Sequence, residues 1–216
     1  MIRYIKTLAG VFLYLFCCVL ALAPLLVIRP HIEGLHYGIG VTVWALVSFL
    51  CFFPVMAVIV NRVWFFRGKG EPISLERLRA MILDVNTLDA PVSVKEHGER
   101  LVVSWRCQDQ EWCERIEKTK MKKLYELWLR FDTATRTVTM VDKYRSVDWS
   151  LSPVKVKTGW FAFGTPYFGV ETGMAWGLEN YTDARPEDYE FSPNEIKSPI
   201  LNTILKHGWN VRFRLM

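Results

Sequence analysis

Two long apolar stretches dominate the amino-terminal part of the chain. Residues 8–28 and residues 39–60 contain 21 and 22 consecutive positions without a charged side chain. About 20 apolar residues in a helix cover the roughly 30 Å of bilayer hydrocarbon, so each stretch is long enough to cross a membrane once. The residues between them are polar and include Pro30, which is typical of a short exposed turn. The pattern therefore predicts a transmembrane helical hairpin within residues 1–66.

Basic residues are distributed unequally around these two spans. Arg3 and Lys6 precede the first span, and the turn contains Arg29 alone among lysines and arginines. Five basic residues follow the second span: Arg62, Arg67, Lys69, Arg77 and Arg79. Because cytoplasmic loops carry the excess of Lys and Arg, both termini are expected in the cytoplasm, in a multi-pass protein of the cell (inner or plasma) membrane. A cleavable signal ending at residues 21–23 is the alternative, which the adjacent Pro24 disfavours.

The pattern after the spans predicts one water-soluble domain over residues 71–216. Residues 71–85 have helical periodicity and begin at Ser74, a favourable amino-terminal cap. Residues 91–106 and 124–143 instead alternate between apolar and polar positions, as expected for two antiparallel hairpins with one buried face. The polar segment 110–123 between them fits either a short helix or a long loop.

The carboxyl-terminal third adds a strand, a helix and a final strand. A strand is expected around residues 154–163, and Ser192-Pro193 begins a helix that ends at Gly208. Ser198-Pro199 repeats the start signal within that helix. Residues 209–216 alternate as a strand. The expected fold is α+β: a transmembrane hairpin, then a cytoplasmic domain dominated by an antiparallel sheet, with a juxtamembrane helix and a carboxyl-terminal helix.

Charge confirms that the chain has two dissimilar parts. The whole sequence has 27 Lys+Arg and 22 Asp+Glu, a net charge of +5. Residues 1–60 hold three of the basic residues and one of the acidic ones, so 24 and 21 remain beyond residue 60. An excess of only a few charges in the predicted domain does not indicate a nucleic-acid partner.

The segment 159–177 combines five glycines with six aromatic side chains, and it is a candidate binding site. A bent hairpin with buried rings is the interpretation that we favour, because glycine within strands marks bulges and close backbone approach. A binding groove walled by the rings, or a loop that enters the membrane interface, are the alternatives. The aromatic residues concerned are Trp160, Phe161, Phe163, Tyr167, Phe168 and Trp176.

The run 143–150 is a second candidate binding segment. It places Arg145, Asp148 and Trp149 close together in the sequence. A buried Arg145–Asp148 ion pair that orders the loop is the interpretation that we favour, and binding by these three residues is the alternative.

Basic residues after the second span and in segment 110–123 are candidates for contact with anionic lipid. Three glutamates alternate with the cations in the first half of that segment, so a solvated polar loop is the competing interpretation. The predicted membrane-surface cations are Arg62, Arg67, Lys69, Lys118, Lys120, Lys122 and Lys123.

Evidence for catalysis in the sequence is thin. His97 and His207 fall at a hairpin tip and a helix end, where a solvated or capping histidine is usual. Cys107 and Cys113 lack the short spacing of structural zinc sites and are expected to be free thiols. Four carboxylates, Asp142, Asp148, Glu171 and Glu179, are expected in solvated positions. No phosphate-binding loop is present, and neither a metal nor a cofactor is expected.

These patterns favour a membrane-anchored, non-enzymatic protein whose cytoplasmic β-rich domain binds a protein partner or lipid headgroups at the membrane surface. The order of two spans and a sheet-rich domain is similar in outline to bacterial membrane-anchored pleckstrin-homology-like proteins, a resemblance of architecture that implies no site residue. The alternatives are a membrane-tethered hydrolase or lipid-modifying enzyme and an accessory subunit of a larger membrane complex. The expected partners are the lipid bilayer and either a membrane protein or a second copy of the chain, and no nucleic acid.

Overall fold

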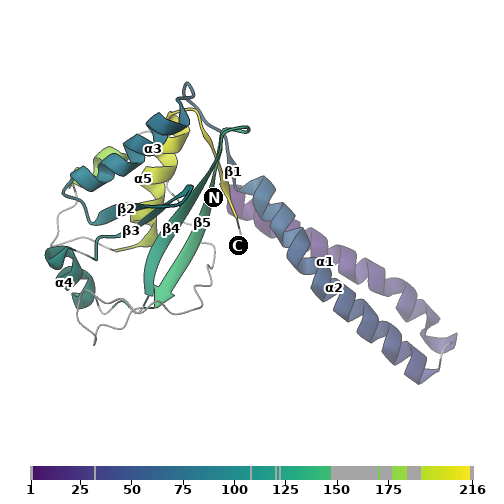
Figure 1. Cartoon of the computed structure of the whole chain (residues 1–216). Coiled ribbons are helices and arrows are strands. Elements are labelled where there is room, and N and C mark those ends of the chain that lie inside the picture. The colour runs from purple at the N-terminus through teal and green to yellow at the C-terminus, as the bar shows by residue number, and fades with distance from the viewer. Residues whose placement is uncertain are drawn as a thin grey trace. The chain divides into compact units, whose positions relative to one another are not determined.

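The structure is a computed structural model that describes residues 2–31, 33–107, 109–119, 121, 123–146, 170, 177–183 and 191–214. The chain forms two compact units, Met1–Trp64 and Phe65–Met216. The first is a pair of helices, and the second contains a six-stranded sheet with helices (Figure 1). The chain is therefore of the mixed α+β class, as predicted.

The first unit consists of α1 (Ile2–Ile28), the short 3-10 helix η1 (Arg29–His31) and α2 (Gly34–Val63). Both long helices extend beyond the predicted spans, and both continue through an internal proline, Pro24 or Pro54. They are long and apolar enough to cross a membrane. All of the large apolar side chains that are exposed among the described residues belong to this unit, between Ile2 and Val58. Contiguous exposed apolar surface of this kind is typical of a membrane or protein contact.

The two long helices pack as an antiparallel pair. At Gly10 an added Cβ would lie 3.0 Å from Cδ1 of Ile59, so the absence of a side chain permits close approach there. About one turn further along α2, the Arg3 guanidinium donates to the carbonyl of Val63 at 3.0 Å. Trp64 Nε1 donates to Oγ1 of Thr7 at 3.1 Å. The start of α1 and the end of α2 therefore lie together, as a hairpin requires.

The second unit is built on one open sheet. In chain order its strands are β1 (Phe65–Phe66), β2 (Val92–His97), β3 (Arg100–Trp105), β4 (Lys123–Asp132), β5 (Thr137–Ser146) and β6 (Asn210–Phe213). Their spatial order is β1-β6-β5-β4-β3-β2. Neighbouring strands are antiparallel except for the parallel pair β5 and β6. The two hairpins predicted from alternation, β2–β3 and β4–β5, are confirmed.

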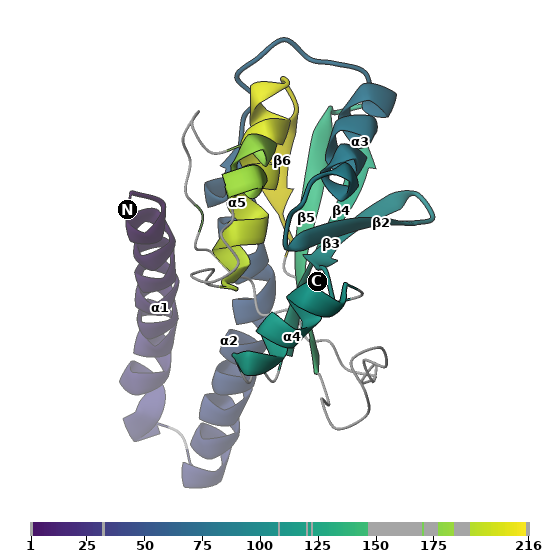
Figure 2. The same ribbon diagram turned by 90° about the vertical axis from the view of Figure 1, so that its left-hand side faces the viewer.

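One face of the sheet forms the core. The inward positions alternate along each strand with outward ones, and they include Leu101, Val103, Leu127, Leu129 and Met140, each no more than 1% exposed. Helices α3 (Leu75–Leu83) and α5 (Pro193–Lys206) cover this face (Figures 1 and 2). Leu78 and Ile82 of α3 and Ile196, Ile200 and Ile204 of α5 are completely buried.

Two shorter helices of the domain form where their sequences allow a helix. Ser74 caps α3, since its hydroxyl accepts the backbone N–H of Arg77 at 3.3 Å. Segment 110–123 contains the helix α4 (Gln110–Lys118), which resolves the choice between helix and loop for its first part. Trp112 and Ile116 of α4 are buried, so this helix is amphipathic although its sequence is polar on average.

Helix α5 is continuous through the repeated start signal at Ser198-Pro199. Ser198 is completely buried, and its hydroxyl donates to Oδ1 of Asn194 at 2.5 Å instead of capping a new helix. Pro199 removes only one backbone donor, and the buried isoleucines on either side hold the helix in place. The second signal therefore begins no separate helix.

The segment that follows α2 is part of the domain rather than a free linker. Lys69 N–H donates to the carbonyl of Leu205 at 2.8 Å, and Gly68 N–H donates to Oδ1 of Asn210 at 3.1 Å. An added Cβ at Gly70 would lie 1.8 Å from the carbonyl oxygen of Lys206. Gly208 has a φ of +74°, and its added Cβ would lie 2.5 Å from Pro72 N. These glycines allow two backbone segments to pass each other closely, which fixes the start of the domain.

Candidate functional site

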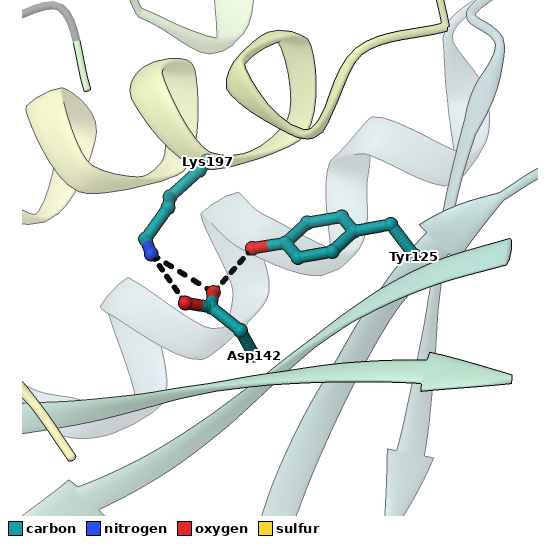
Figure 3. A network of polar contacts seen from close by, with 3 residues as sticks. All are labelled: Tyr125, Asp142 and Lys197. Atoms are coloured by element: carbon teal, nitrogen blue, oxygen red, sulfur yellow. Dashed lines mark hydrogen bonds and ion pairs between the residues drawn. The ribbon is translucent and has the colours of Figure 1, made fainter. Parts of the chain in front are cut away.

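A buried ion pair joins α5 to the sheet. Lys197 Nζ lies 2.9 Å from Oδ1 and 2.7 Å from Oδ2 of Asp142, and Tyr125 donates its hydroxyl hydrogen to Oδ1 at 2.5 Å. Figure 3 shows Lys197 descending from the helix while Tyr125, on β4, points at the same carboxylate on β5. The Lys197 and Asp142 side chains are 1% and 4% exposed. The prediction that Asp142 is solvated is wrong.

Burial determines the protonation behaviour of this network. It raises the pKa of the Tyr125 hydroxyl well above its usual value, and the Asp142 carboxylate raises it further. It lowers the pKa of the Lys197 ammonium, while Asp142 opposes that change. The Asp142 carboxylate accepts hydrogen bonds from both Lys197 and Tyr125. The buried charges are therefore paired and hydrogen-bonded within the apolar core. The low exposure of all three side chains makes this a structural site.

The outward face of the sheet carries a second cluster of charges, whose members are exposed or half-buried. Register pairs Arg100 with Arg130 and places Val102 opposite Trp128. On the neighbouring strand β2, Lys95 is paired with the same Val102. Glu126 on β4 is paired with Lys143 on β5. We call this surface the basic sheet face, and its cations are Lys95, Arg100, Arg130, Lys143, Arg145 and Arg212.

Trp128 and Glu126 lie at the centre of the basic sheet face. Glu126 forms an ion pair with Arg145, whose guanidinium nitrogen lies 2.8 Å from Oε1 of Glu126. Its other oxygen, Oε2, accepts a hydrogen bond from Trp128 Nε1 at 3.1 Å. Lys143 Nζ lies 3.6 Å from the centroid of the Trp128 ring, a cation–π contact. His97 meets the same ring edge-on, at a centroid separation of 5.3 Å. Trp128 is thus held between polar groups on the surface of the sheet.

The cations of the basic sheet face affect one another electrostatically. Partial burial lowers the pKa of the Lys143 ammonium, and the positive charges of Arg100 and Arg145 add to that effect, whereas Glu126 opposes it. Glu126 is already engaged by Arg145 and Trp128, and its side chain is 12% exposed. The face therefore carries more positive charge than its own carboxylates neutralise.

The predicted aromatic binding segment lies outside the described residues. Of the segment 159–177, the structure describes Val170 and Gly177, which are not among the aromatic candidates. The hypothesis of a groove or a bent hairpin there stays a prediction for Trp160, Phe161, Phe163, Tyr167, Phe168 and Trp176.

The second candidate segment is described in part. Arg145 lies on β5 and forms its ion pair with Glu126, while Asp148 and Trp149 lie outside the described residues. Arg145 thus has an acidic partner, Glu126, other than the Asp148 that the sequence predicts. The predicted contact between Arg145 and Asp148 stays untested.

The predicted membrane-surface cations fall on several elements. Arg62 is in the last turn of α2, Arg67 and Lys69 follow β1, Lys118 ends α4 and Lys123 begins β4. All five are exposed. Lys120 and Lys122 lie outside the described residues.

The histidines and thiols of the domain have identifiable contacts. His207 ends α5, and its Nδ1 lies 2.8 Å from the carbonyl oxygen of Thr203, as expected for a histidine at a helix carboxyl terminus. Cys107 and Cys113 are free thiols. Burial raises the pKa of Cys107 to about 12 and also raises that of Cys113. Within the described part of the chain, no group of three or more His, Cys, Asp or Glu side chains could hold a metal ion.

Sequence reasoning missed Lys197 and the basic sheet face, although both have signals in the sequence. Lys197 precedes Leu201 by one helical turn and so lies on the apolar side of α5. Asp142 follows Val138 and Met140 in the inward phase of β5. Charged residues at core positions of two elements indicate a buried pair. The outward cations were separated in the sequence, and only the register of β2 to β5 brings them together.

Comparison with protein-family models, with curated proteins and with solved structures finds no match to this chain. The fold and site define its class on their own: a mixed α+β protein with an amino-terminal helix pair that could span a membrane and a six-stranded sheet domain.

Proposed function

We propose that this chain is a membrane-anchored, non-enzymatic protein of the cell membrane, with both termini in the cytoplasm. Its β-rich domain binds a protein partner or lipid headgroups at the membrane surface. The observation that carries this proposal is the exposed apolar surface of α1 and α2. The chain passes from α2 into the domain without a linker. Helix α2 ends at Val63, and β1 begins two residues later at Phe65.

The start of the domain supports an anchoring role for the helix pair. β1 pairs with the last strand, β6, and the following segment is hydrogen-bonded to the end of α5. Since no flexible linker separates α2 from the sheet, a membrane crossed by α2 would lie within a few residues of the domain along the chain. Such proximity favours ligands found at the membrane surface over ligands in the bulk solvent.

The contacts of the ionisable groups support binding rather than catalysis. Asp142 is neutralised in the core by Lys197, and His207 bonds to the carbonyl oxygen of Thr203 at the end of α5. Arg145, a candidate binding residue from the sequence, is paired with Glu126 on the outward face. Each of these groups has a structural partner that explains it.

Extraction of membranes with alkaline carbonate tests the anchoring part of this proposal. Full-length chain expressed in cells should stay in the membrane pellet after carbonate treatment and should be released by mild detergent. Release by carbonate would contradict the proposal, because peripheral proteins leave the membrane under that treatment. Purification in mild detergent then tests the partner, since a bound protein should co-purify with the full-length chain in a fixed ratio.

A further inference from the structure

The basic sheet face collects positive charge from most strands of the sheet. Six cations lie on five strands in the outward phase, and the carboxylates in that phase are Glu126 and Asp132. Asp132 lies at the β4–β5 turn, where its carboxylate accepts hydrogen bonds from the turn residues Ala134 and Thr135. The acidic groups of this face are thus engaged locally, and the face keeps a net positive charge.

Three of these cations are available to an external anion. Lys95, Arg100 and Arg130 are exposed, and the ion pairs formed among the described residues do not include them. Arg100 and Arg130 are directly opposite each other on β3 and β4. Opposed residues of neighbouring strands have Cβ atoms about 5 Å apart, so like charges there repel each other. An anion bound between the two guanidinium groups would relieve that repulsion and could accept hydrogen bonds from both.

The surroundings of this pair complete a binding surface. Trp128 is the next outward residue on β4 before Arg130, and Lys143 rests on its ring. The indole offers an amphipathic surface of the kind enriched at membrane interfaces. Glu126 is turned to Arg145 and Trp128, so it does not compete with a ligand for Arg100 and Arg130.

We propose that the basic sheet face binds the phosphate-bearing headgroups of anionic lipids, with Arg100 and Arg130 as the principal ligands to phosphate and Lys95 and Lys143 beside them. This inference rests on the proposed function and gives it a site and a ligand class. A lipid is favoured over an acidic protein segment because β1 begins two residues after the end of α2. Cations within a Debye length of an anionic leaflet are attracted to it, and the chain order keeps this domain at that surface.

The test uses full-length chain in phosphatidylcholine nanodiscs, mixed with vesicles of phosphatidylcholine alone or of phosphatidylcholine with phosphatidylserine. Co-sedimentation should occur with the phosphatidylserine vesicles and not with phosphatidylcholine alone. The variant R100Q/R130Q should bind about 25-fold more weakly, since each cation at an anionic surface contributes about fivefold. The charge-matched control R77Q/K206Q removes two exposed cations from α3 and α5, and it should stay within about twofold of the parent chain.

Each other outcome overturns the inference. If R100Q/R130Q and the control lose vesicle binding equally, the net charge of the domain attracts the lipid and the basic sheet face has no special part in it. Unchanged binding in R100Q/R130Q would remove both arginines from the site, provided that the variant keeps the circular dichroism and melting temperature of the parent. Binding of a poly-glutamate peptide without binding of phosphatidylserine vesicles would favour an acidic protein partner. If the chain also leaves membranes under carbonate, the proposed function fails; if it stays, only the headgroup site fails.

Discussion

Lys197 of α5 lies 2.7 Å from Asp142 of β5, and the two side chains are almost completely buried. They come from elements 55 residues apart in the sequence, so their contact exists only in the folded domain. Charges removed from water are costly unless each is paired and hydrogen-bonded. The pair therefore specifies where α5 lies on the sheet, with Tyr125 supplying a further hydrogen bond to the carboxylate.

Replacing one member of this pair should be far more harmful than replacing the whole network. K197M leaves Asp142 charged and buried, so we expect the free energy of unfolding to fall by about 3–5 kcal/mol. The triple variant K197M/D142L/Y125F, which has no buried polar group at these positions, should be more stable than K197M alone. Chemical denaturation monitored by circular dichroism measures both.

A matched control for this test lies on the same helix. Lys206 is 3.7 Å from Glu179, and both side chains are more than half exposed. K206M should therefore change the free energy of unfolding by less than about 1 kcal/mol. Equal effects of K197M and K206M, or a triple variant less stable than K197M, would contradict the role given to the buried pair.

Tyr125 should contribute a smaller, separable amount. Y125F removes one hydrogen bond to a charged acceptor that still has Lys197, so a loss of about 1.5 kcal/mol is expected. Because burial and Asp142 raise the pKa of this hydroxyl, Tyr125 should also ionise after the exposed tyrosines in an alkaline titration followed by ultraviolet absorbance. The absorbance change at the highest pH should be smaller in Y125F than in the parent chain. An unchanged absorbance step at that pH would contradict the assignment of a raised pKa to Tyr125.

The glycines after α2 should tolerate no side chain. G70A would place a Cβ only 1.8 Å from the carbonyl oxygen of Lys206, and the resulting backbone displacement should cost about 3 kcal/mol. Gly98 at the β2–β3 turn has open space around it and a φ of +60°, so G98A should cost only about 1 kcal/mol, from backbone strain. A G70A variant as stable as G98A would show that the segment after β1 is not fixed against α5.

Cys107 should resist alkylation at moderately alkaline pH. Burial raises its pKa from the usual 9.0 to about 12, so the reactive thiolate is scarce in the folded chain near pH 9. In the unfolded chain the Cys107 thiol loses its proton at lower pH than in the folded chain. Between pH 9 and 12 the folded state therefore binds more protons than the unfolded state. Stability should therefore fall as pH rises through this range, and less so in C107S. Iodoacetamide should label Cys107 at least about tenfold more slowly in the folded chain than in denaturant; equal rates would contradict this.

Periodicity predicts most of the fold because the relevant interactions are local. Alternation along β2 to β5 and the caps of α3 arise from neighbouring residues, and these elements form where the pattern indicates. Pairing between strands distant in the sequence is different. No local pattern indicates that β6 lies parallel to β5 or that β1 pairs with β6.

The candidate sites depend on those distant pairings and were mostly missed for that reason. Asp142 was expected in solvent because carboxylates on strands and loops are usually solvated, but its phase on β5 and the position of α5 bury it. Arg100 and Arg130 are 30 positions apart, and they become neighbours only through the register of β3 and β4. Spacing along the chain therefore did not reveal the surface that we consider functional.

The central claim is that α1 and α2 cross the membrane and keep the sheet domain on its inner side. Single cysteines introduced by H36C, near the start of α2, and by E99C, at the β2–β3 turn, can be labelled with a membrane-impermeant maleimide and compared with the parent chain. In intact spheroplasts H36C should be labelled, and E99C should be labelled only after permeabilisation. Labelling of E99C from outside in intact spheroplasts would contradict the claim.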